Sequence, residues 1–186
     1  MEMKEKYNKI NKVLDYIKNI LEVPRKEYGG LSACPFAKKE RESDNLYIDI
    51  LDKDNEFLDL MDNFYKSGKG NAIFINEIEL FNINTKKYQE TLNNELLLNA
   101  FIHHKALCIN PKDKLEVKGL NVRSKSPYFL ILINNSKEIN EAHQNILKTS
   151  YFDKMDDEYK KYLCEIWKYL KNLMVGEHYP FIGIED

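Results

Sequence analysis

Residues 127–134 read PYFLILIN and form the clearest strand pattern in the chain. Pro127 suits the first position of a strand, because proline has no N–H to donate to a neighbouring strand. The residues after it are apolar at successive rather than alternate positions, which is typical of a strand buried on both faces. We therefore predict that this segment lies near the centre of a β-sheet.

Three other segments have strand patterns. Residues 45–51 (NLYIDIL) alternate aliphatic side chains with polar or aromatic ones, and residues 71–78 (NAIFINEI) form a short apolar run. Residues 100–109 (AFIHHKALCI) either continue the preceding helix or form a strand, and we favour the strand.

Apolar residues that recur every three or four positions predict the helices. The predicted helices cover residues 5–21, 55–66, 86–99, 136–148 and 155–174. The expected inner face of the second helix consists of Phe57, Leu58, Met61 and Phe64 or Tyr65. Asn84 or Thr85 is expected to cap the third helix, and residues 25–44 are expected to form a loop.

Helices that precede, separate and follow the strands indicate an α+β (or α/β) fold. We predict one domain over residues 1–186, with a small mixed sheet of about four strands flanked by N- and C-terminal helices. Residues 176–186 (GEHYPFIGIED) form an apolar tail beyond the last predicted helix. Such a tail either folds back onto its own domain or docks on a partner, for example on a second copy in a homodimer.

The composition excludes several classes of protein. The chain has 186 residues, of which 43% are hydrophobic and 31% charged, and its net charge is −2 at pH 7. It lacks the basic excess of a nucleic-acid-binding protein, and no segment approaches the ~18 apolar residues of a membrane span. The N-terminal residues are too charged for a signal peptide. We expect a cytoplasmic, soluble protein without a nucleic-acid or membrane partner.

The three cysteines, Cys34, Cys108 and Cys164, are far apart, and none belongs to a C-x-x-C pair. This spacing indicates neither a disulfide framework nor a zinc ribbon, so reduced thiols are expected. Basic residues, Lys38 among them, follow Cys34 closely and would stabilise a reactive thiolate. The apolar neighbours in ACPF favour a small buried residue instead, and the sequence leaves both interpretations open.

His103 and His104 precede Cys108 in the predicted strand at 100–109. On a strand, His104 and Cys108 share a face, whereas His103 points the other way. These side chains are donors that zinc or iron could use, although a set of four ligands at a recognised spacing is missing. The plainer alternative is an ordinary half-exposed histidine.

Hydrogen-bond donors crowd the entrance to the apolar strand. Arg123, Lys125, Ser126 and Tyr128 lie within six residues and could hold a carboxylate or a phosphate. The alternative is a turn in which Pro127 sets the first strand residue.

The segments LSACPFAKK (31–39) and NVRSKSPYFLILIN (121–134) resemble two motifs of domain-of-unknown-function family 1415, found in bacteria and plastids. That family combines an early Cys-Pro-Phe-Ala motif with a later Ser-Pro-Tyr-Pro motif, and here Phe129 replaces the second proline. The resemblance implies that Cys34 and the Ser126 region share a site, and it names no reaction.

Two functions fit these features. The first is an enzyme in which Cys34 is the nucleophile or a metal ligand and His103 or His104 is the base. Its substrate would be a small anionic molecule held by Lys38 and by the donors at residues 123–128. The second is a binding or assembly module without chemistry that uses the tail at 176–186.

Overall fold

The computed structural model describes residues 3–26, 30, 32–34, 37–53, 55–78, 84–113 and 123–148. Its elements are α1 (Met3–Tyr16), the π-helical turn η1 (Ile17–Leu21), α2 (Ala37–Glu42), β1 (Leu46–Leu51), α3 (Phe57–Ser67), β2 (Asn71–Asn76), α4 (Thr85–Leu98), β3 (His104–Ile109), the 3-10 turn η3 (Arg123–Lys125), β4 (Phe129–Asn135) and α5 (Ser136–Leu147). The predicted helix at 155–174 and the tail at 176–186 lie outside these residues.

The strands form one mixed sheet in the order β1-β2-β4-β3. β1 and β2 are parallel, whereas β4 runs antiparallel to both β2 and β3. The prediction from PYFLILIN is confirmed, because β4 is an interior strand whose Leu130, Ile131 and Ile133 are at most 1% exposed. The α+β class with a four-stranded mixed sheet is confirmed as well.

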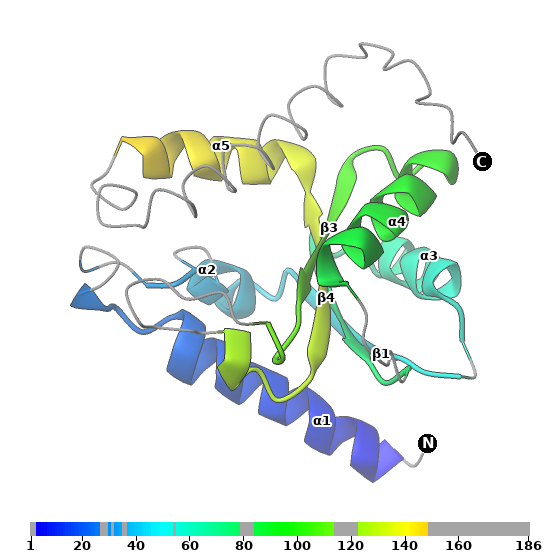
Figure 1. The fold of residues 1–186 in the computed structure, drawn as a ribbon, viewed down its shortest axis with the longest axis horizontal. Coiled ribbons are helices and arrows are strands. Elements are labelled where there is room, and N and C mark those ends of the chain that lie inside the picture. The colour runs from blue at the N-terminus through cyan, green and yellow to red at the C-terminus, as the bar shows by residue number, and fades with distance from the viewer. Residues whose placement is uncertain are drawn as a thin grey trace.

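Each face of the sheet carries a separate hydrophobic core. Figure 1 shows α3 and α4 on one side of the sheet and α1, α2 and α5 on the other. Phe74 and Ile131 belong to the core under α3 and α4, which we call the first core. Ile75 and Leu130, their neighbours in sequence, belong to the second core with Val13 of α1. Adjacent strand residues point to opposite faces, so successive apolar residues in β2 and β4 fill both cores.

The predicted loop at 25–44 is wrong in part, because it contains α2. This helix has six residues and none of them is buried, so it leaves no apolar periodicity in the sequence. The predicted inner face of α3 also needs correction: Leu60 is buried, whereas Leu58 is half-buried and Tyr65 is 66% exposed.

The helices predicted at 5–21, 86–99 and 136–148 agree with the structure. Asn84 caps α4, since its Oδ1 accepts the Lys87 N–H at 3.1 Å. No helix within the described residues is long and apolar enough to cross a membrane.

Candidate functional site

Cys34 lies in the turn that leads from η1 into α2. Its N–H donates to the Leu21 carbonyl at 3.0 Å, and its own carbonyl accepts the Ala37 N–H at 3.1 Å. The residue is half-buried and packs against the second core. Both backbone bonds hold the turn in place, so the position of the sulfur is set by local structure.

The basic residues after Cys34 do not all point to it. Arg41 forms a bidentate ion pair with Glu22, with Nε–Oε1 at 2.7 Å and Nη2–Oε2 at 2.9 Å. The hydrogen bond from Arg41 lowers the pKa of Glu22. Lys38 is exposed and lines a shallow depression on α2 with Lys39 and Glu42. The Arg41 charge is thus used in attaching α2 to η1.

The donors ahead of β4 have structural partners of their own. Ser126 is buried, and its hydroxyl donates to the Tyr128 carbonyl at 2.7 Å, which closes a turn. Lys125 is exposed at the end of η3, of which Arg123 is the first residue. Tyr128 is half-buried and packs against the second core, as Cys34 does. The structure therefore brings these two sequence motifs to the same core.

His104 lies on the face of the sheet opposite to Cys34. The His104 ring makes edge contacts with Phe64 and Tyr65, at centroid distances of 5.4 and 6.2 Å, on the α3 side of the sheet. Burial, followed by the neighbouring His103, lowers the pKa of His104. His103 is exposed. The sheet thus separates His104 from Cys34.

Cys108 is fully buried in the first core, on the same face as His104. The shared face agrees with the alternation of side chains along β3. Over the described ranges, no group of three or more His, Cys, Asp and Glu side chains is arranged to hold a metal ion.

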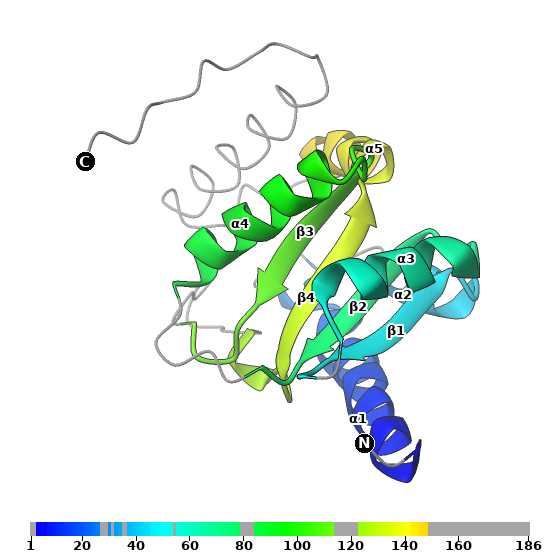
Figure 2. The same ribbon diagram turned by 90° about the vertical axis from the view of Figure 1, so that its right-hand side faces the viewer.

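A groove that the sequence analysis missed opens between α3 and α4. Figure 2 shows these two helices on the same face of the sheet. Its volume is about 550 Å³. Its apolar lining consists of Leu51, Phe57, Leu58, Ile78 and Leu92. Leu51 and Leu92 are at most 2% exposed, so the floor of the groove belongs to the first core.

The groove lies where β1 ends. Asn55 fixes the turn into α3, because its Oδ1 accepts the Asp52 N–H at 3.2 Å and its Nδ2 donates to the Ile50 carbonyl at 3.1 Å. In open α/β sheets, ligands bind at the carboxyl ends of the strands, and β1 belongs to the parallel pair of this sheet.

Charged side chains surround the apolar floor of the groove. Asp52, Glu56 and Glu95 supply three carboxylates, and Lys53 supplies one ammonium group. Glu95 forms no ion pair with any residue of the described ranges. The groove therefore combines an apolar surface with an excess of negative charge, which attracts cations.

Tyr88 adds a neutral hydroxyl to the groove. Burial raises the pKa of Tyr88 to about 12, and Cys108 and Glu95 act in the same direction. Its ring packs edge-on against Phe129 at 5.8 Å. The hydroxyl stays protonated at neutral pH and forms no hydrogen bond within the described part of the chain.

Comparison of the chain with protein-family models, curated proteins and solved structures gives no match. The resemblance to domain-of-unknown-function family 1415 stays a prediction.

Proposed function

We propose that this protein binds a small, positively charged and partly apolar molecule in the groove between α3 and α4. One observation carries this proposal: among the described residues, a buried apolar floor is bordered by three carboxylates and one lysine. An aromatic or aliphatic part of the ligand would cover the floor, and an amine would face Glu95 and Asp52.

The charge preference follows from the surroundings of Glu95. A cation that meets this carboxylate beside apolar side chains is attracted more strongly than in open water, because the low-dielectric wall reduces screening. The proton on Tyr88 offers a hydrogen bond to an acceptor on the ligand.

The test is a calorimetric comparison of 2-phenylethylamine with 2-phenylethanol and phenylacetate at low ionic strength. These probes share the phenyl group and differ in the charge of the head group. We expect the amine to bind at least about tenfold more tightly than the other two, which corresponds to ~1.4 kcal/mol. Equal affinity for the amine and the alcohol would contradict the proposal.

Matched variants on α4 test the role of the carboxylate. Glu95→Gln removes one charge from the groove and should weaken binding of the amine about three- to tenfold, with little effect on the alcohol. Glu90→Gln is the control, since Glu90 is exposed on the same helix and does not line the groove. A similar loss of affinity in both variants would point to general surface charge and would count against a specific site.

A second candidate function is thiol chemistry at Cys34 on a small anionic substrate. The observation that favours it is that Cys34 and Tyr128, from two motifs far apart in sequence, pack against the same core. In this case Lys38 and Lys125 would supply positive charge for the substrate, because both are exposed lysines close in sequence to these motifs. His104 does not take part, since it lies beyond the sheet.

A further inference from the structure

Lys105 is a buried lysine without a counter-ion. Its side chain is 5% exposed and forms no ion pair or hydrogen bond with any residue that the structure describes. Burial alone lowers the pKa of Lys105. Lysines are rarely buried unless they are paired, so this position calls for a physical explanation.

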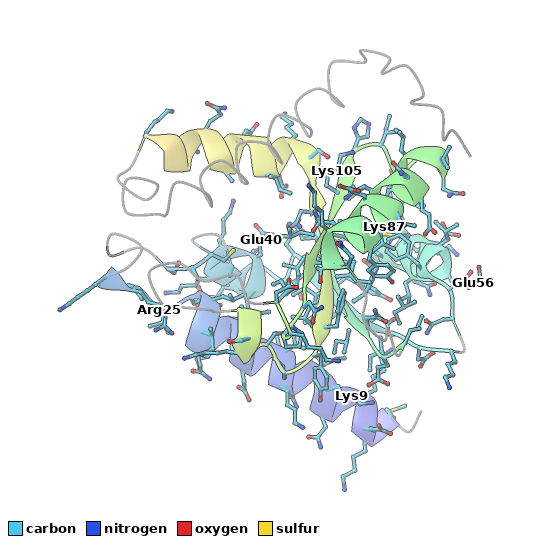
Figure 3. The ribbon with its side chains drawn as sticks, viewed as in Figure 1. Lys9, Arg25, Glu40, Glu56, Lys87 and Lys105 are labelled. Atoms are coloured by element: carbon cyan, nitrogen blue, oxygen red, sulfur yellow. The ribbon has the colours of Figure 1, made fainter. Side chains whose placement is uncertain are left out.

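Lys105 lies at the end of the sheet where α5 begins, as Figure 3 shows. It pairs with Asn134 of β4, two residues before Ser136, the first residue of α5. The Ser136 N–H donates to the His103 carbonyl at 2.8 Å and so continues the β3–β4 pairing by one step. Ser136 is thereby a diagonal neighbour of Lys105 across the two strands.

Ser136 also lacks a partner. Its Oγ is fully enclosed and forms no hydrogen bond. A lysine and a hydroxyl group, both at least nine-tenths buried and both unpaired among the described residues, thus occupy neighbouring backbone positions at the first turn of a twelve-residue helix.

Two carboxylates at this end of the sheet are held by amides. Asn71 Nδ2 donates to Glu40 at 2.9 Å and to Glu138 at 3.3 Å, and Asn45 Nδ2 donates to Glu40 at 2.8 Å. Neither carboxylate pairs with Lys105. The positive end of the α5 dipole disfavours an ammonium group here as well.

The Lys105 nitrogen is not fully enclosed by the described residues. Among the described residues, the fully enclosed polar side-chain atoms without a partner are Arg25 Nε, Asn76 Nδ2 and Ser136 Oγ. The Lys105 Nζ atom has no partner among the described residues and is not one of these enclosed atoms. Part of the small exposed area of Lys105 therefore belongs to Nζ. Leu107 and Leu132, next to it on the sheet, are only half-buried.

We propose that Lys105 is a nucleophilic amine that forms a Schiff base with a small aldehyde at the start of α5. The free amine attacks the carbonyl carbon, and the carbonyl oxygen gains a proton to give a carbinolamine. Loss of water then gives the imine, so the step needs no oxidant or reductant. Rotation of the Ser136 side chain about its Cα–Cβ bond brings its hydroxyl out of the enclosed position, and the hydroxyl then donates a hydrogen bond to the carbonyl oxygen. This site lies apart from the groove and does not depend on it.

The test uses the full chain, propanal and sodium cyanoborohydride at neutral pH, followed by peptide mass mapping. The reductant converts each imine into a stable propyl-lysine. We expect Lys105 to be modified faster than Lys137 and Lys148, because a lowered pKa leaves more of the amine unprotonated at neutral pH. Lys137 and Lys148 are exposed on and beside α5 and serve as internal controls. Modification of Lys105 at or below their rate would overturn the proposal.

Two further measurements separate reactivity from simple exposure. The modification rate of Lys105 should level off at a lower pH than that of a lysine side chain in an unstructured model peptide, and coincident pH profiles would contradict an unpaired buried amine. Ser136→Ala should slow modification at Lys105 several-fold and leave Lys137 unchanged. An unchanged rate at Lys105 in this variant would refute the role of the hydroxyl.

Discussion

Cys34 and Cys108 have the same functional group in opposite environments. Cys108 is 0% exposed within the first core, whereas Cys34 is half-buried in a turn. A fully buried thiol is alkylated only when the structure opens locally. Every ~1.4 kcal/mol of free energy needed for this opening slows the alkylation tenfold.

We therefore expect iodoacetamide to modify Cys34 at least about a hundredfold faster than Cys108 in the native protein. Peptide mapping of a time course measures both rates, and unfolding in urea should make them similar. Comparable rates in the native state would contradict the burial of Cys108. A Cys34 rate above that of free glutathione at the same pH would support the second candidate function.

The Glu22–Arg41 ion pair makes a pH-dependent contribution to stability. The pKa of Glu22 is lowered from its ordinary value of 4.5 in the folded state. The pair therefore stabilises the fold above that pH, and the contribution is lost as the pH falls through the folded pKa.

Arg41→Gln should lower the melting temperature at pH 7, and the difference from the parent protein should be smaller at pH 3. Thermal unfolding followed by circular dichroism at both pH values measures this. Lys39→Gln is the control, because Lys39 is exposed on the same helix. A difference that is the same at both pH values would show that the ion pair is not its cause.

At the scale of elements, α4 closes one edge of the sheet. Asn93 accepts the Ala106 N–H at 2.9 Å through Oδ1 and donates to the Ala106 carbonyl at 3.1 Å through Nδ2. Gln89 accepts the Cys108 N–H at 2.9 Å. β3 is an edge strand, so its outward backbone groups would otherwise be unpaired and open to another chain.

Asn93→Ala should lower the free energy of unfolding by about 2–6 kcal/mol, because two buried backbone groups lose their partners at about 1–3 kcal/mol each. Urea denaturation measures this loss, and light scattering should show an increased tendency to associate through β3. Asn94→Ala is the matched control, since Asn94 is exposed, and should change stability by less than about 0.5 kcal/mol. Equal effects of the two substitutions would contradict edge closure by Asn93.

Elements that bury many apolar side chains were predictable. β4 and β2 lie between two cores, and their runs of successive apolar residues indicate burial on both faces. α2 was missed because it buries no residue. The burial of Asn93 was not predictable either, since a polar residue on the inner face of a helix is recognised only once its partner on β3 is known.

At the scale of the molecule, polar groups gather at opposite ends of one apolar sheet. The groove lies at the end of the sheet where β1 ends, at Leu51. Lys105 lies at the opposite end, where β1 begins with Leu46. The sheet positions both groups, because its register fixes which side chains share an end.

The sequence indicated this arrangement only in part. It singled out Cys34 and Tyr128, which do pack on one core, and it singled out His104, which lies on the other face. Asp52, Glu56 and Glu95 were not recognised, because carboxylates on helices and turns are usually solvated and these three share no motif. Lys105 was overlooked between His104 and Cys108, where its burial depends on pairing with β4.

The central claim is that the groove between α3 and α4 is a binding site for small cations. Titration of isotope-labelled protein with 2-phenylethylamine, followed by amide chemical shifts, tests it most directly. We predict saturable shifts that are largest in residues 52–58 and 88–95, with little change in α1. Shifts that do not saturate, or that centre on Cys34 and Tyr128 instead, would contradict the account.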